Sequence, residues 1–271
     1  MLNLLIMLLT ISLVLGVAFL LSDDKPKINK RTVIVGLGLQ SLLTLFVLKT
    51  SIGAKILETI ALNIQNIANF GLEGVGFVWG DLTGMNVFFV NVLCLIIFMS
   101  ALIAVLQYLG VIPFLVKHLG GFLAKVLGTN KAETFNAVAN LIMGQTESPL
   151  MIKPFFKGLS ESELFSVMVT GMGSASFAIL VGYSAMGIPM EYLLIAVFAS
   201  MFSSLIIAKI MKPNTTKDDE NVEVVKSDAS NIFDAIGQGT MDGLNMVLAI
   251  MASLIAFVGL IALVNGILGL V

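Results

Sequence analysis

A short polar turn carries the residue types best suited to binding chemistry. Residues 144–149 read Gly-Gln-Thr-Glu-Ser-Pro and separate two arms, 134–143 and 150–156. Each arm is too short to cross a bilayer core, which takes about 20 helical residues. Two short arms around a polar turn are typical of a re-entrant hairpin, and the sequence predicts one over 133–158. The alternative is that these residues form a loop in water.

The turn has the groups that a polar solute needs. Glu147 would be the only carboxylate at that depth, and an intramembrane carboxylate is a functional candidate by default. Pro149 stands where a starting helix accepts proline, so the free N–H groups of the second arm would face the turn and help to hold a polar ligand. Irregular backbone at this depth is tolerated only where protein buries it or it lines a watery cavity.

A second interruption, Gly-Met-Gly-Ser-Ala-Ser at 171–176, breaks an apolar stretch. Small residues in a membrane helix usually permit close packing. A broken helix can also bind a cation through its freed carbonyls. Asn140 lies one turn before the hairpin tip, with Met143 on the same face. Amide, hydroxyl and carbonyl oxygens suit sodium, whereas a proton site usually needs an ionisable group. Two discontinuous elements near the bilayer middle indicate an ion-coupled transporter of a polar solute.

The composition restricts the elements that can position these residues. Of the 271 residues 58% are hydrophobic and 12% are charged, about half the globular norm of roughly 25%. This excludes a soluble enzyme with one core, and the net charge of -2, without a basic patch, excludes a nucleic-acid binder. The single Cys94 and single His118 exclude a disulfide framework and a two-histidine site. With no His-Glu-x-x-His or Gly-x-Ser-x-Gly motif, an enzyme is not expected. We predict an all-α polytopic membrane protein.

The apolar runs and the cations predict how the chain crosses the membrane. Six runs can span: 4–21, 33–49, 86–108, 164–188, 191–211 and 246–271. Counted over alternate loops, thirteen of the fifteen Lys and Arg residues fall on one side and two on the other. The positive-inside rule makes the richer side cytoplasmic and places the N-terminus outside the cytoplasmic membrane. Segment 112–163 then begins and ends in the cytoplasm, so any apolar part of it must enter the membrane and turn back.

Two amphipathic segments complete the expected architecture. Residues 54–70 have an isoleucine stripe at helical spacing, which indicates either an interfacial helix on the outer surface or a helix packed on other spans. Residues 231–245 predict a second amphipathic helix, on the cytoplasmic side, that leads into the last span. We divide the chain into 1–84, with the N-terminal spans and outer helix; 86–188, with the third span, hairpin and broken fourth span; and 189–271, the C-terminal region.

Several segments resemble the concentrative nucleoside transporter family. The turn at 144–149, Phe-Asn-Ala-Val-Ala-Asn at 135–140 and Val-Gly-Tyr-Ser-Ala-Met-Gly at 181–187 carry the resemblance, and 91–107 and 260–269 extend it along nearly the whole chain. The Gly-Gln-Thr-Glu turn followed by the Gly-Tyr-x-x-Met-Gly segment is the most specific part.

The resemblance implies a homotrimeric elevator-type symporter in the lipid bilayer that takes up nucleosides. It implies that Gln145, Thr146 and Glu147 read the nucleobase and that Ile179 packs on it. The implied sodium ligands are Asn140 and Ser174, with Met143 and Ala175 acting through backbone carbonyls. Because proton-coupled relatives tend to lack the asparagine, Asn140 favours sodium, and a proton is the alternative coupling ion.

The chain departs from the family in its length. A second re-entrant hairpin and two further spans, which supply the ribose contacts, have no counterpart here. We therefore expect a complete nucleobase half-site and an absent ribose half-site. A non-transporting fragment, or one half of a split transporter, is the alternative to an active symporter.

Overall fold

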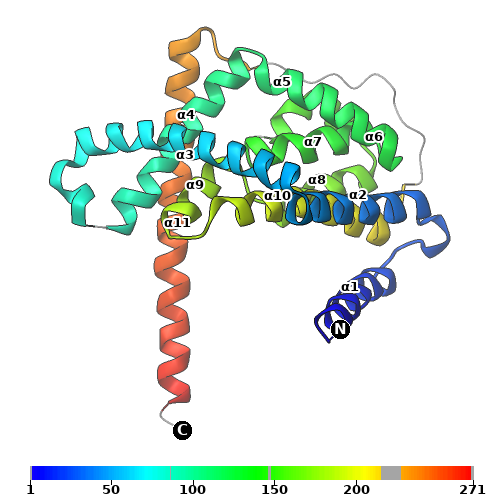
Figure 1. Cartoon of the computed structure of the whole chain (residues 1–271). Helices are drawn as coiled ribbons and strands as arrows, with labels where there is room; N and C mark the ends of the chain where they lie inside the picture. Colours follow the sequence, from blue (N-terminus) through cyan, green and yellow to red (C-terminus); the bar gives the residue numbers. More distant parts are fainter. Residues whose placement is uncertain (1, 86, 146–147, 215–226, 270–271) are drawn as a thin grey trace.

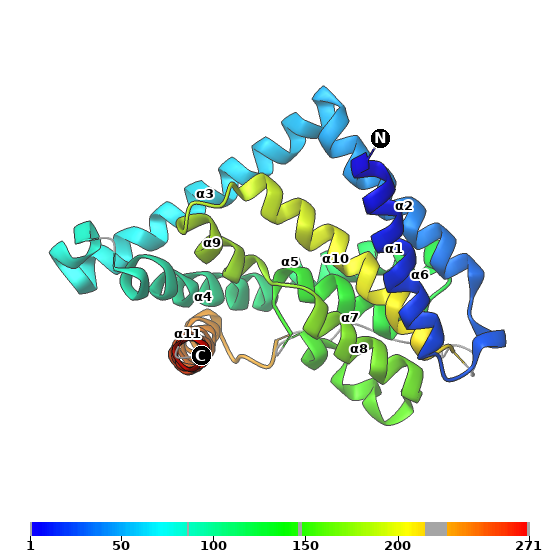
Figure 2. The same ribbon diagram turned by 90° about the horizontal axis from the view of Figure 1, so that it is seen from below.

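A computed structural model describes residues 2–85, 87–145, 148–214 and 227–269, and within them every regular element is helical. Figures 1 and 2 show the arrangement. Five described helical stretches are long and apolar enough to cross a membrane: Lys30–Lys49, Phe89–Tyr108, Glu161–Ala185, Met190–Met211 and Ile232–Leu268. The first predicted span forms α1 (Leu2–Leu20), whose section Leu9–Leu20 is a shorter apolar helix. The predicted all-α membrane fold is confirmed.

A tight corner joins α2 (Lys30–Lys49) to α3 (Ser51–Trp79), which form two sides of a wedge in Figure 2. Thr50 ends one helix and begins the other: its N–H donates to Phe46 O at 3.2 Å, and its hydroxyl accepts from Gly53 N at 2.9 Å. A Cβ at Gly53 would lie 2.2 Å from Phe46 O, so only glycine fits here. The predicted amphipathic helix exists and is longer than 54–70. It packs against α2 and α10 (Met190–Met211).

The last helix, α11 (Ile232–Leu268), has 37 residues and is therefore about 55 Å long. It packs along α4 (Cys94–Tyr108), which the π-helical turn η3 (Phe89–Leu93) precedes. Two glycines allow the close approach: a Cβ at Gly239 would lie 2.5 Å from Ala104 Cβ, and one at Gly243 would lie 2.8 Å from the Ile97 Cα. Small residues four apart are a common device for packing membrane helices.

The prediction of a separate amphipathic helix over 231–245 is corrected by this helix. Asn231 caps α11 by accepting from Asp234 N at 3.0 Å, and the helix then continues through to Leu268 without a break. Gly239 and Gly243 serve contact with α4 and do not interrupt the backbone. From Leu254 onward its large apolar side chains are exposed in this chain, as expected for a span that faces lipid or other segments. Figure 1 shows this end extending beyond the remaining helices.

The hairpin segment turns back on itself. Its first arm is α7 (Lys131–Ile142), which starts with a capping box between Asn130 and Glu133. Its second arm is the 3₁₀ helix η5 (Ser148–Gly158), which packs against α7. The two predicted arms are thus present, and Pro149 is the second residue of the returning arm.

The predicted break in the fourth span is also present. Helix α8 (Glu161–Gly173) stops, three residues follow without helical structure, and α9 (Phe177–Ala185) begins. Both α7 and α10 pack against α8. The remaining short elements are connections, namely η1 (Lys25–Lys27), η2 (Gly80–Met85), α5 (Val111–Leu115), η4 (Val116–Gly120) and α6 (Gly121–Leu127).

Candidate functional site

A neutral polar cluster joins the first hairpin arm to the broken helix. Asn140 is 1% exposed, and its Nδ2 donates to Thr170 O at 2.7 Å and to Ser174 Oγ at 2.5 Å. The Ser174 hydroxyl also donates to Thr170 O, at 2.9 Å. The break after Gly173 brings Ser174 and a main-chain carbonyl to one point. The structure thus brings together Asn140 and Ser174, which are 34 residues apart in sequence.

A neighbouring asparagine leaves an acceptor open. Asn136 lies one turn before Asn140 on α7 and is fully buried, and its Nδ2 donates to Thr170 Oγ1 at 3.1 Å. Its Oδ1 has no hydrogen-bond partner among the described residues. A buried amide oxygen of this kind needs a donor, a water or a cation to offset its lost hydration.

A cavity of about 710 Å³ lies beside this cluster. The hairpin tip contributes Gly144 and Gln145, and the broken helix contributes 174–176 with Ile179 and Tyr183. The opposite wall is one face of α11, where Asp242, Asn245 and Ser253 are the polar residues. A cavity of this size with a few convergent polar groups is typical of a small-molecule site.

The tip of the hairpin touches the break directly. Gly144 has φ +109°, a conformation that favours glycine, and a Cβ there would lie 3.3 Å from Ser176 Cβ. Ser176 is 1% exposed, and its Oγ has no hydrogen-bond partner among the described residues although the residue lines the cavity. The glycine therefore permits a close contact between two residues that line the cavity, one of which carries an available hydroxyl.

Most of the predicted site residues converge. Gln145, Ile179, Ser174 and Ala175 line the same cavity. Met143 follows the last residue of α7, is 2% exposed, and donates its N–H to Ala139 O at 2.9 Å. Thr146 and Glu147 lie outside the described residues.

Sequence reasoning missed Ser176 and the wall on α11. Asp242 and Asn245 belong to the polar face of the amphipathic segment 231–245, which the sequence predicts as a helix on the cytoplasmic side. Their two side chains are three residues apart and share a face, so the same signal is compatible with a cavity wall. Ser176 is the residue before α9, where a serine is ordinarily explained by helix capping, yet it makes no capping hydrogen bond there.

The donor set decides which cation fits. Among the residues that the structure describes, no three His, Cys, Asp or Glu side chains gather to hold a metal ion. The groups available at the cluster are amide, hydroxyl and main-chain carbonyl oxygens. These neutral hard ligands suit an alkali cation better than a transition metal. An all-helical membrane fold with a broken helix, a hairpin and a cavity between them is the arrangement typical of the secondary-transporter class of membrane proteins.

Comparisons with known proteins place this chain in a family. Models described as "Na+ dependent nucleoside transporter N-terminus", "Nucleoside recognition" and "Na+ dependent nucleoside transporter C-terminus" match residues 9–82, 89–190 and 192–271. The chain is 39% identical to the nucleoside permease NupC of Helicobacter pylori over 92% of its length and 30% identical to human solute carrier family 28 member 3 over 91%. It superposes on a structure of CNTnw in an inward-facing substrate-bound state with a TM-score of 0.92 at 40% identity. The chain belongs to the concentrative nucleoside transporter family.

The match is nearly complete for this chain and partial for its relatives. It covers 97% of this chain and 66% of the CNTnw chain. It covers 62% of the Helicobacter pylori permease and 36% of the human carrier. The chain therefore spans less than two thirds of the length of the curated relatives named here.

Proposed function

We propose that this chain takes part in sodium-coupled uptake of nucleosides by symport across the cytoplasmic membrane, with its N-terminus outside and as a homotrimer. One observation carries the proposal: Ser174 belongs both to the buried cluster with Asn140 and to the wall of the cavity. An ion at the cluster and a solute in the cavity would share this residue. Such sharing gives the two ligands a coupling free energy, which by linkage is reciprocal.

The sodium site we propose uses Asn140, Ser174 and the backbone carbonyls of Met143 and Ala175. The amide of Asn140 now presents Nδ2 to Ser174 Oγ and Thr170 O. Rotation of this amide by about 180° exchanges nitrogen for oxygen and turns the same corner into a set of oxygen ligands. A cation would then replace the amide N–H groups as the partner of those oxygens. The four proposed ligands carry no formal charge, which favours sodium over a proton.

The nucleobase site we propose lies at the hairpin tip. Gln145 lines the cavity and is exposed to it, and Ile179 faces it from the first turns of α9. An amide, the Thr146 hydroxyl and the Glu147 carboxylate can pair with the donors and acceptors of a base, with the charge-assisted bond the strongest. Ile179 would cover the flat face of the base with apolar surface.

Radiolabelled uridine uptake into bacteria without nucleoside transporters tests this function. The whole chain is expressed, and uptake is measured with a sodium gradient and with choline in its place. We expect sodium-dependent uptake that Glu147→Gln abolishes and that the exposed control Glu73→Gln on α3 leaves unchanged. Uptake that follows pH and ignores sodium would identify proton coupling.

A second candidate function rests on length. Because the chain spans 62% of the Helicobacter pylori permease, it could serve as one half of a split transporter. Absence of uptake from well-expressed, membrane-inserted chain would support this second function and contradict uptake by this chain alone. Uridine binding to the purified chain, measured with and without sodium, then reports whether the nucleobase half-site works by itself.

A further inference from the structure

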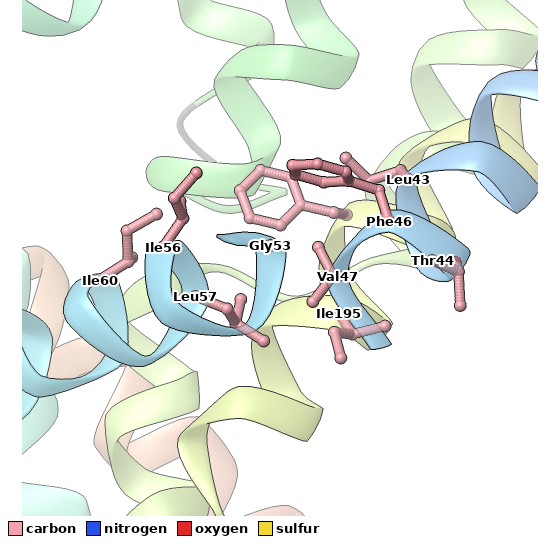
Figure 3. A pocket seen from close by; sticks show the side chains of 10 residues that line it. Leu43, Thr44, Phe46, Val47, Gly53, Ile56, Leu57, Ile60 and Ile195 are labelled. Carbon is pink, nitrogen blue, oxygen red and sulfur yellow. The ribbon is translucent and has the colours of Figure 1, made fainter. Parts of the chain in front are cut away.

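A separate apolar pocket lies at the corner between α2 and α3, far along the chain from the proposed transport site. Figure 3 shows Leu43, Phe46 and Val47 of α2 facing Ile56, Leu57 and Ile60 of α3 across it, and Ile195 and Phe198 of α10 close it. Its volume is about 200 Å³. A dry cavity of about 150 Å³ can hold a molecule the size of benzene, so this pocket has room for part of a hydrocarbon chain.

The lining decides the chemistry of the occupant. Apart from Thr44, every lining residue is apolar or glycine. The Thr44 hydroxyl already donates to Gln40 O at 2.8 Å. Because the Thr44 hydroxyl is already hydrogen-bonded within α2, the pocket offers no free polar group. It therefore favours a ligand whose buried part has no polar atoms.

The pocket opens toward the apolar surface of a membrane protein. Phe46, Ile56 and Ile60 are 41%, 50% and 39% exposed, although they line it. Exposed apolar side chains on a membrane-spanning fold face acyl chains or other apolar segments. A lipid chain can therefore enter from the side without passing through water.

A cation stands beside the opening. Ile56 and Ile60 also line a shallow neighbouring recess, together with Ile52, Thr59 and Lys55. Lys55 has no carboxylate within ion-pair distance among the described residues, and Lys49 at the end of α2 has none either. These are the two cations that flank the corner at Thr50.

The nearest acidic residue on α3, Glu58, is a neighbour of Lys55, but no ion pair joins the two side chains among the described residues. At about 100° per residue, Glu58 lies roughly 60° from Lys55, on the side opposite Ile56 and the recess. The recess therefore presents an unpaired ammonium group directly next to an apolar slot. A phospholipid with an anionic headgroup has the matching arrangement, with a negative charge at one end of its hydrocarbon chains.

We propose that this corner is a binding site for an anionic phospholipid of the surrounding bilayer. One acyl chain occupies the pocket between α2, α3 and α10, and the headgroup phosphate contacts Lys55, with Lys49 adding to the local positive charge. The bound chain fills space that side chains leave empty, so it stabilises the α2–α3 corner by mass action. The inference is independent of the proposed transport function.

Lipid retention by the purified whole chain tests the proposal. The chain in detergent is titrated with phosphatidylglycerol, and bound lipid is counted by native mass spectrometry while thermal unfolding is followed. Phosphatidylcholine with the same acyl chains, and inorganic phosphate alone, are the ligand controls. We expect retention and a raised Tm with phosphatidylglycerol, a smaller effect with phosphatidylcholine and none with phosphate.

Matched variants separate the headgroup from the chain. Lys55→Gln is expected to weaken phosphatidylglycerol binding about five-fold, while Lys55→Arg keeps it and the exposed Lys125→Gln on α6 leaves it unchanged. Ile60→Phe narrows the mouth of the pocket and is expected to lower retention of both lipids.

Several outcomes would overturn the site. Equal retention of both lipids, an unchanged affinity in Lys55→Gln, or a thermal shift with inorganic phosphate alone would each do so. Because Lys55→Arg and Ile60→Phe are tested on folded protein, as judged by circular dichroism, a variant that fails to fold does not decide the result.

Discussion

Helix α7 contributes to two buried polar clusters, which offset the cost of burying polar groups in different ways. At its first turn, Glu133 is 0% exposed and forms an ion pair with Lys209 of α10, which is 3% exposed. At its last turns, Asn136 and Asn140 form the neutral cluster with Thr170 and Ser174 of the fourth span. The first cluster contains full charges and the second contains none.

The residues of the charged cluster are hydrogen-bonded mainly to one another. Lys209 Nζ donates to Ser162 Oγ at 3.0 Å and to Asn214 Oδ1 at 2.6 Å, besides its contact with Glu133. Asn214 in turn donates to Asn130 Oδ1 at 3.0 Å, and Asn130 N donates to Glu133 Oε1 at 2.8 Å. Glu133 and Lys209 each have the opposite charge and a further hydrogen bond, and Asn130 Nδ2 also donates to the buried Glu163 Oε1 at 2.7 Å. This cluster ties α7, α8 and α10 together and offers little to a ligand.

The neutral cluster is left open by comparison. Asn136 Oδ1 lacks a partner among the described residues, and Ser174 also faces the cavity. The comparison indicates that a buried, paired charge holds helices together. Buried uncharged oxygens without hydrogen-bond partners are instead available to bind a ligand.

Breaking the charged pair should have the largest effect. Lys209→Met leaves Glu133 buried and unpaired, and we expect a loss of about 3–5 kcal/mol in the free energy of unfolding. The double variant Glu133→Leu with Lys209→Met should recover most of that loss because neither charge of the pair stays behind without its partner. Thermal unfolding in detergent measures both, with Lys125→Met as the exposed control. A single variant as stable as the double would show that the pair does not fasten the helices.

Substituting the shared asparagine should have the next largest effect. Asn140→Ala removes one ion ligand, so the sodium concentration for half-maximal uptake should rise about tenfold or more. Ser174→Ala should act in the same direction. The ratio of purine to pyrimidine uptake should stay constant, and Asn63→Ala on the exposed face of α3 should change nothing. An effect confined to base selectivity would contradict the cation assignment.

The wall over the base should matter less. Ile179→Ala removes apolar contact with the base, and we expect several-fold weaker uridine binding. The half-saturating sodium concentration, measured at saturating uridine, should stay unchanged. Isothermal titration at two sodium concentrations separates the two ligands. If the variant changed sodium affinity and left uridine affinity unchanged, Ile179 would belong to the ion site and not to the solute site.

The smallest effect is expected on α11. Asp242→Asn removes a carboxylate from the far wall of the cavity, and uridine is uncharged, so uptake should change no more than about two-fold. A nucleoside monophosphate, which the carboxylate repels, should compete better in the variant than in the unaltered chain. Competition assays at low salt measure this difference, and Glu191→Gln is the matched acidic control.

The local features of this chain could be predicted from its sequence. The break at 171–176 and the polar turn at 144–149 are visible because small and polar residues stand out against apolar runs. The pairing of Asn140 with Ser174 is implied by the family resemblance alone, since no spacing rule joins two residues 34 positions apart.

The long-range features could not be predicted in this way. Counting Lys and Arg residues by loop does not indicate that Lys209 is buried against Glu133, because hydropathy does not report which charges find partners. The continuity of α11 was also missed. The change from an amphipathic to a uniformly apolar pattern indicates only that the environment of the side chains changes. It does not indicate that the helix ends there, because one continuous helix can cross from one environment to the other.

The glycines between α4 and α11 make one wall of the cavity depend on residues that no solute reaches. A single methyl group at Gly239 would meet Ala104 and Ser100, so it would have to displace α11 and carry Asn245 with it. A saturation-mutagenesis screen for altered substrate preference should therefore recover changes at the α4–α11 contact. In such a screen, the positions that alter selectivity will include residues that do not line the cavity.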